Sequence, residues 1–311
     1  MLDDRKSNTF AYFQVLLYLI CLYVQRPKVQ LLIEYMKQHF WDPATYSVPE
    51  LKISYKETMK RLRAKYYGYI VIMLVCASAF CYGRIALDGR HVPENMTFKS
   101  YIPPGVNFWA LFAWQHIQAT GTINILTSMD FCICSIVSLT TLQFRLLRYE
   151  VETLFDGFEN DQNGSNEFKN KFRKCNGHHN FLLSFTTMVV NTFSMLMFIY
   201  MGVIVIILCI ETYLLFCIDN LVDFMRLVTY TLLMYVELFV CFCYPSQELF
   251  DEANQLSISL YCNTNWYNYP SCYRNILILL GKSQRRVIFT ACGLLDLDLR
   301  TGMSVSRELR Y

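Results

Sequence analysis

The chain has few of the features that mark an enzyme or a nucleic-acid-binding protein. The motifs GxSxG, HExxH and GxGxxG are absent, as is GxxxxGK followed by Ser or Thr, so these signatures predict no hydrolase, dinucleotide or phosphate-loop chemistry. Only 5 of the 311 residues are His, charged residues make up 17%, and the formal net charge is +3. We therefore expect no enzyme, no cofactor and no nucleic-acid partner.

Zinc-site spacing is missing as well, although the chain has 13 Cys. Cys132 and Cys134 are separated by one residue, as are Cys241 and Cys243, whereas zinc sites usually place two residues between paired Cys. These four Cys lie in apolar runs, where a Cys usually serves as a small hydrophobic side chain. We expect no metal site.

Charge is absent from long stretches of the chain. Residues 180–210 form a run of 31 residues without Asp, Glu, Lys or Arg. A bilayer core about 30 Å thick needs roughly 20 helical residues, so this run is long enough to cross a membrane. Hydrophobic residues make up 54% of the chain, and further apolar runs cover residues 9–24, 66–82, 120–142, 221–243 and, with a break, 276–280 and 287–295. The sequence predicts an all-α, polytopic transmembrane helix bundle.

The positive residues between these runs predict the orientation. The counts of Lys and Arg are nine in residues 25–65, two in 85–118, six in 143–182, none in 217–220 and four in 244–286. Because cytoplasmic loops carry an excess of Lys and Arg, the first, third and last of these loops are expected in the cytoplasm, with both termini outside. The first run is expected to be a span and not a signal peptide, since no small-x-small cleavage site follows it.

Two glycosylation sequons provide a check on this orientation. Asn95-Met-Thr97 falls in a loop expected outside, so Asn95 is the expected glycosylation site, whereas Asn163-Gly-Ser165 falls in a loop expected inside. With both termini outside, one upstream span that enters from the cytoplasm is expected to be missing.

Ionisable residues lie within the apolar runs. Asp130 is near the middle of one run and Glu237 near the middle of another. A charge in a membrane is costly, so both are functional candidates, with an interhelical hydrogen bond or a hydrated vestibule as the alternative explanation. His178 and His179 are expected at a helix entry, where they predict a polar cap at the membrane surface.

The segment after the fifth run carries a specific pattern across residues 243–299. Its elements, in order, are Cys243-Tyr244, Gln247, Leu249, Tyr261, Trp266-Tyr267, Arg274, Ser283-Gln284-Arg285, and Thr290-Ala291 with Gly293. This order resembles the C-terminal signature of insect odorant receptors. Upstream, the resemblance extends only to the layout, which has a basic first loop, an outer loop with Tyr101-Ile-Pro-Pro, and the long fourth span.

The resemblance implies a subunit of a ligand-gated cation channel in the plasma membrane of olfactory sensory neurons. Such subunits lie in membrane lipid, bind small volatile molecules among the middle spans, and assemble with a shared co-receptor into a hetero-tetramer. Residues 1–243 would form the bundle with its ligand pocket, 244–286 a cytoplasmic anchor region, and 287–311 the start of the pore helix and a divergent tail. By position, the subunit anchor would include Trp266, Tyr267 and Arg274, and the pore-lining helix would open with Thr290, Ala291 and Gly293.

Aromatic residues supply candidate ligand contacts. The chain has 22 Tyr and 23 Phe, and small apolar ligands bind in mostly apolar clefts with a few polar anchors. Candidates from the outer halves of the spans are Phe80, Tyr82, Tyr200, Phe224 and Tyr230. Aromatic packing explains each of these positions equally well.

The chain departs from the family pattern near its end. Arg286 stands where the family has Pro, and the apolar run after Gly293 ends in the charged residues 296–300. Residues 287–295 span only about 14 Å as a helix, so the last span is expected to be incomplete and the chain truncated at both ends. A non-conducting binding or assembly subunit is therefore an alternative.

Three other families match less well. A gustatory receptor would carry a Thr-Tyr motif in the last span, which is absent. Arg148-Tyr149-Glu150 resembles part of a G-protein-coupled receptor signature, but Leu147 replaces the acidic residue before the Arg. A secondary transporter would favour paired broken helices in an internal repeat, and none is evident.

Overall fold

The computed structural model describes residues 4–42, 49–88, 105–154, 162–217, 221–262 and 273–308. Long helices dominate, and they are followed by a short hairpin and a final helix. In chain order the elements are α1 (Asp4–His39), α2 (Pro49–Asp88), α3 (Phe108–Glu152), α4 (Gln162–Cys217), α5 (Leu221–Glu237), the π-helix η3 (Leu238–Cys243), α6 (Tyr244–Cys262), α7 (Tyr273–Ser283), β1 (Thr290–Ala291), β2 (Leu295–Asp296) and α8 (Leu299–Glu308).

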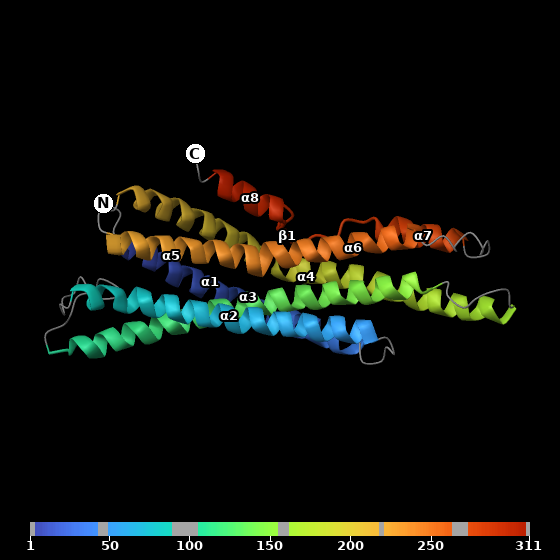
Figure 1. Cartoon of the computed structure of the whole chain (residues 1–311), viewed down its shortest axis with the longest axis horizontal. Coiled ribbons are helices and arrows are strands. Elements are labelled where there is room, and N and C mark those ends of the chain that lie inside the picture. The colour runs from blue at the N-terminus through green and yellow to red at the C-terminus, as the bar shows by residue number, and fades with distance from the viewer. Residues whose placement is uncertain are drawn as a thin grey trace.

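The helices form one elongated bundle, with most axes along its length (Figure 1). Each of the five unbroken apolar runs lies within this helical framework, which confirms the prediction of an all-α membrane bundle. Three helices in the described ranges are long and apolar enough to cross a membrane, namely Phe108–Glu152, Glu167–Cys217 and Leu227–Cys262, and a bent pair within α1 would make a fourth. Residues 66–82 lie in α2.

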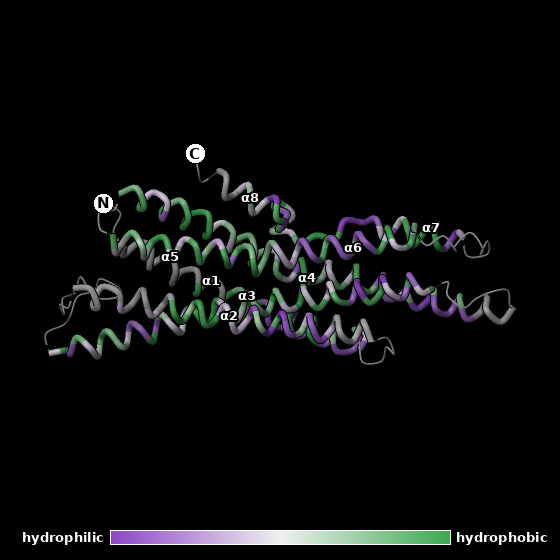
Figure 2. Tube along the Cα trace, in the orientation of Figure 1, coloured by the Kyte–Doolittle hydropathy of each residue, from purple (hydrophilic) through white to green (hydrophobic). Residues whose placement is uncertain are grey.

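Hydropathy divides the bundle along its length. Hydrophilic residues concentrate at the end that holds α6, α7 and the start of α4, and hydrophobic residues concentrate toward the other end (Figure 2). Helices of 36 to 56 residues, α1 to α4, are about 54 to 84 Å long, well beyond the thickness of a bilayer core. The polar ends of these helices therefore extend out of the membrane on one side, the side that the Lys and Arg counts assign to the cytoplasm.

The segment that follows α1 is fixed between α3 and α4. The Trp41 backbone N–H donates to the amide oxygen Oε1 of Gln143 at 2.9 Å, and Gln143 Nε2 donates back to the Trp41 carbonyl at 3.1 Å. The Trp41 ring also stacks on His178, with ring centroids 3.8 Å apart. His178 lies well inside α4, so the prediction of a polar cap at a helix entry was wrong.

The hairpin replaces the helix expected after residue 287. Thr290 pairs with Asp296 and Ala291 with Leu295, and Gly293 adopts a left-handed backbone (φ 67°) in the turn between them. Glycine adopts this conformation without the clash that a Cβ brings, so the turn interrupts the apolar run. The hairpin packs on α4, where the Cys292 backbone N–H donates to Ser194 Oγ at 2.6 Å. A helix begins only at Leu299.

Helix α8 approaches η3 closely through a glycine. A Cβ on Gly302 would lie 2.8 Å from Phe239 Cε1 and 3.0 Å from Cys243 Sγ. We expect Gly302→Ala to weaken the docking of α8 by about 1–3 kcal/mol, because the ring must move to make room. Labelling of Cys243, which is buried, by a membrane-permeant maleimide should then rise several-fold in peptide mass spectrometry.

The matched control is Gly202→Ala in α4, where an added Cβ meets no atom within 4 Å. This variant should label Cys243 at the rate of the parent chain. Equal labelling of the Gly302→Ala variant and the parent would contradict the role of α8 as a cover over Cys243.

Candidate functional site

A buried cluster of acidic and tyrosine side chains lies in the middle of the bundle. The Tyr200 hydroxyl of α4 donates a hydrogen bond of 2.9 Å to Glu237 Oε1, at the end of α5. Tyr200 is 0% exposed and Glu237 4% exposed. Water is excluded from both groups, so this bond replaces the solvation that each lost on folding.

A second carboxyl group meets the first from α3. Asp130 is 1% exposed, and no N–H or hydroxyl donor among the described residues reaches either of its oxygens. The carboxyl group of Glu237 lies close to it. Two buried carboxyl groups this close together are costly in a membrane, so the pair stays a functional candidate.

Tyr69 completes the cluster from α2. Its hydroxyl is buried near Glu237 and makes no hydrogen bond among the described residues. Aromatic rings pack against both tyrosines of the cluster. The ring centroid of Phe131 lies 5.6 Å from that of Tyr69, and the centroid of Phe242 lies 4.7 Å from that of Tyr200. The cluster therefore brings together side chains of four helices, α2 to α5, in a dry environment with a hydrogen bond between α4 and α5.

The backbone changes its winding directly after Glu237. Residues Leu238–Cys243 form a π-helix between α5 and α6, and Leu238, Cys241, Phe242 and Cys243 are buried. Such π segments are rare and are often found at functional sites. Among the described residues no three His, Cys, Asp or Glu side chains are arranged to hold a metal ion.

Comparisons with known proteins agree on one family. The family model described as 7tm Odorant receptor matches residues 7–308. The chain belongs to the odorant receptor family. The insect olfactory receptor OR5 from Machilis hrabei has the same fold, with a TM-score of 0.81 at 12% identity over 98% of this chain and 78% of that one. The structure of OR5 in complex with eugenol gives a TM-score of 0.80 at 13% identity, and the shares of the two chains that are covered are the same. A search of curated proteins finds no match.

The residues expected to contact the ligand lie in different parts of the receptor. Tyr200 lies in the acid and tyrosine cluster. Tyr82 is 45% exposed and contacts the rings of Phe112 and His116 on α3, with centroids 5.2 and 5.3 Å away, and Phe224 on α5 is 38% exposed. Phe80 and Tyr230 belong to α2 and α5, but their side chains lie outside the described part of the receptor.

The other expected site residues also lie apart from the cluster. Thr290 and Ala291 form β1, and Gly293 lies in the following turn, so the helix expected to open at these residues is not formed there. Arg274 is exposed in the first turn of α7. Trp266, Tyr267 and Asn95 lie outside the described residues, so their roles remain predictions.

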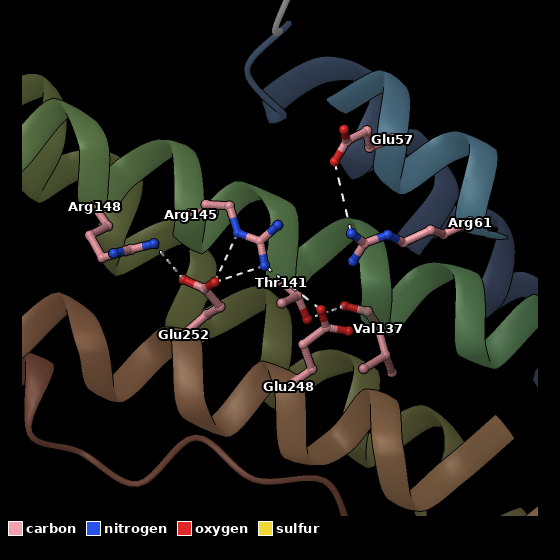
Figure 3. Close-up of polar contacts among 8 residues, drawn as sticks. All are labelled: Glu57, Arg61, Val137, Thr141, Arg145, Arg148, Glu248 and Glu252. Atoms are coloured by element: carbon pink, nitrogen blue, oxygen red, sulfur yellow. Dashed lines mark hydrogen bonds and ion pairs between the residues drawn. The ribbon is translucent and has the colours of Figure 1, made fainter. Parts of the chain in front are cut away.

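Ion pairs at the polar end of the receptor join α3 to α6 (Figure 3). Arg145 Nη2 lies 2.8 Å from Glu252 Oε1, and its Nε donates to the same oxygen at 2.8 Å. Arg148 Nη2 lies 3.3 Å from Glu252 Oε2. The sequence pattern placed Arg148 only in a partial receptor motif and did not indicate its partner, because the partner lies more than 100 residues away.

Proposed function

We propose that the chain is an odorant receptor subunit that binds a small volatile molecule and gates a cation channel together with a co-receptor. The observation that carries the proposal is the match of the odorant receptor family model to residues 7–308, nearly the whole chain. The fold shared with a receptor that has been solved with eugenol supports a small volatile as the ligand class. The plasma membrane of olfactory sensory neurons is the site that this function requires.

The aromatic group around Tyr82 is the proposed apolar wall of the ligand site. Tyr82, Phe112 and His116 combine large apolar faces with polar atoms at their edges, which suits a small ligand with one or two polar groups. Tyr200 would act through the acid and tyrosine cluster. The full set of proposed contacts is Phe80, Tyr82, Tyr200, Phe224 and Tyr230.

The remaining roles belong to the same proposal. Trp266, Tyr267 and Arg274 would hold the subunit to its neighbours in a hetero-tetramer, and the segment that starts with Thr290, Ala291 and Gly293 would contribute to the pore. Residues 1–243, 244–286 and 287–311 would correspond to the ligand-binding bundle, the anchor region and the pore segment.

Co-expression with an odorant co-receptor in cells that lack other receptors tests the proposal. Volatile aromatic compounds should evoke a cation current that requires both chains, and Tyr82→Ala should lower sensitivity about tenfold through the loss of ring contacts. Tyr213→Ala is the matched control, because that ring is 58% exposed and lies on a different helix. Unchanged sensitivity in alanine variants at all five proposed positions would exclude this ligand site.

A non-conducting binding subunit is the second candidate. The observation that favours it is the hairpin at β1 and β2, which stands where the resemblance implies the opening of a pore helix. Volatile ligands would then raise the thermal stability of the purified chain, while cells with normal surface expression of both chains would show no odour-evoked current.

A further inference from the structure

A half-open pocket of about 370 Å³ lies between α2, α3 and the junction of η3 with α6. Its charged lining consists of Arg61 and Lys65 from α2, Arg145 from α3 and Glu248 from α6. Three positive groups and one negative group leave an excess of two positive charges in the wall. The rest of the wall combines apolar side chains, among them Leu62 and Phe239, with the hydroxyl groups of Thr58, Ser138 and Thr141.

The residues that line the pocket lie at the ends of the apolar runs or just beyond them. Lys65 directly precedes the apolar run 66–82, and Arg145 follows the run 120–142. Tyr244, also in the wall, follows the run 221–243. By the distribution of Lys and Arg, these ends of the runs face the cytoplasm, where the membrane surface is rich in anionic lipid.

The positive side chains in the pocket differ in how closely they approach carboxylates of the protein. Arg145 is held by Glu252 at 2.8 Å and lies 3.7 Å from Glu248. Arg61 reaches Glu57 only at 3.8 Å, and both side chains are more than half exposed. Lys65 Nζ lies 4.4 Å from the centre of the Tyr244 ring, and no carboxylate of the described residues lies within ion-pair distance of it. Arg61 and Lys65 therefore keep donors for a further anion.

We propose that this pocket binds the phosphate group of an anionic membrane lipid, with Lys65 and Arg61 as its ligands. Arg and Lys donate charge-assisted hydrogen bonds to phosphate oxygens, and basic pockets between helices at the cytoplasmic side suit lipid head groups. The apolar wall fits the glycerol region. On the same face of α2, seven residues beyond Lys65, Ile72 is 48% exposed, which provides an apolar surface for an acyl chain.

Binding to the purified chain in neutral detergent tests the proposal. A fluorescent short-chain phosphatidylinositol bisphosphate is the probe, with phosphatidylcholine of equal chain length and inorganic phosphate as competitors. The double variant Arg61→Gln/Lys65→Gln should weaken probe binding about tenfold or more, since two charge-assisted contacts are lost. Lys65→Arg keeps the charge and should bind within about threefold of the parent chain.

The matched control is Lys60→Gln/Arg63→Gln, which removes the same charge from exposed positions of the same helix outside the pocket wall. Equal weakening in both double variants would overturn the proposal in favour of diffuse surface attraction. Competition by inorganic phosphate at the same concentration as the lipid would overturn the lipid as occupant and leave a free anion. The experiment measures lipid binding and not an odour-evoked current. A negative result would therefore overturn the lipid site and leave the proposed receptor function standing.

Discussion

Glu237→Ala is expected to lower the free energy of unfolding of the receptor by about 3 kcal/mol. The change removes the acceptor of the buried Tyr200 hydroxyl and leaves a cavity beside the buried side chains of Asp130 and Tyr69. Each buried polar group left without a partner costs about 1–3 kcal/mol, and helices α2 to α5 lose their shared contact. The midpoint of thermal unfolding in detergent should fall by roughly 5–10 °C.

Glu237→Gln separates the hydrogen bonds from the charge. Its amide oxygen still accepts from Tyr200, and its amide N–H can donate to Asp130, so the midpoint should stay within about 2 °C of the parent. Met225→Ala, an exposed position on α5, controls for side-chain truncation. A Gln variant as unstable as the Ala variant would show that the cluster depends on the ionised carboxylate and not on hydrogen bonding.

Arg145 and Glu252 are expected to show a coupling free energy of about 1–2 kcal/mol in a double-mutant cycle. The guanidinium places two N–H donors at 2.8 Å from one carboxylate oxygen, and the side chains are 27% and 14% exposed. Arg145→Ala and Glu252→Ala should each lower the midpoint of thermal unfolding. The double variant should lose clearly less stability than the sum of the two single losses. Partial screening should reduce the coupling at high salt.

Arg61 and Glu57 provide the matched pair, because they are 3.8 Å apart on the surface of α2 with exposures of 73% and 60%. A cycle with Arg61→Ala and Glu57→Ala should give a coupling close to zero. Equal couplings in the two cycles would mean that the α3–α6 contact gains nothing from its partial burial.

The sequence was sufficient to predict the helical framework but not the partners of its polar residues. Runs without charge predicted the helices because their length and composition are local properties. Asp130 and Glu237 were recognised as costly, and for Glu237 one of the two explanations offered, an interhelical hydrogen bond, is present because the Tyr200 hydroxyl donates to it. Tyr69 and Tyr200 were not connected to them, since contacts between residues 37 or more positions apart depend on how the helices pack.

Two local predictions failed for reasons visible in the backbone. Residues 287–295 were expected to begin a helix because they are apolar, but the turn at Gly293 favours a hairpin, and Ser194 on α4 binds its tip. His178 was expected at a helix entry, whereas the helix continues for several turns before it and Trp41 covers its ring. Arg61 and Lys65 were counted only for orientation, so the pocket they line was not foreseen.

The π-helix Leu238–Cys243 fixes the spacing between the two halves of a continuous helix, Leu227–Cys262. Its hydrogen bonds run from residue i to i+5, so the turn holds one residue more than an α-helix would. A residue removed from a regular α-helix rotates everything that follows by about 100°. Removed from the π turn, it would convert that turn to an α turn, and Leu249, Ala253 and Leu256, which are buried, would keep the neighbours they now face. This turn is thus the place where the helix Leu227–Cys262 best tolerates the loss of one residue.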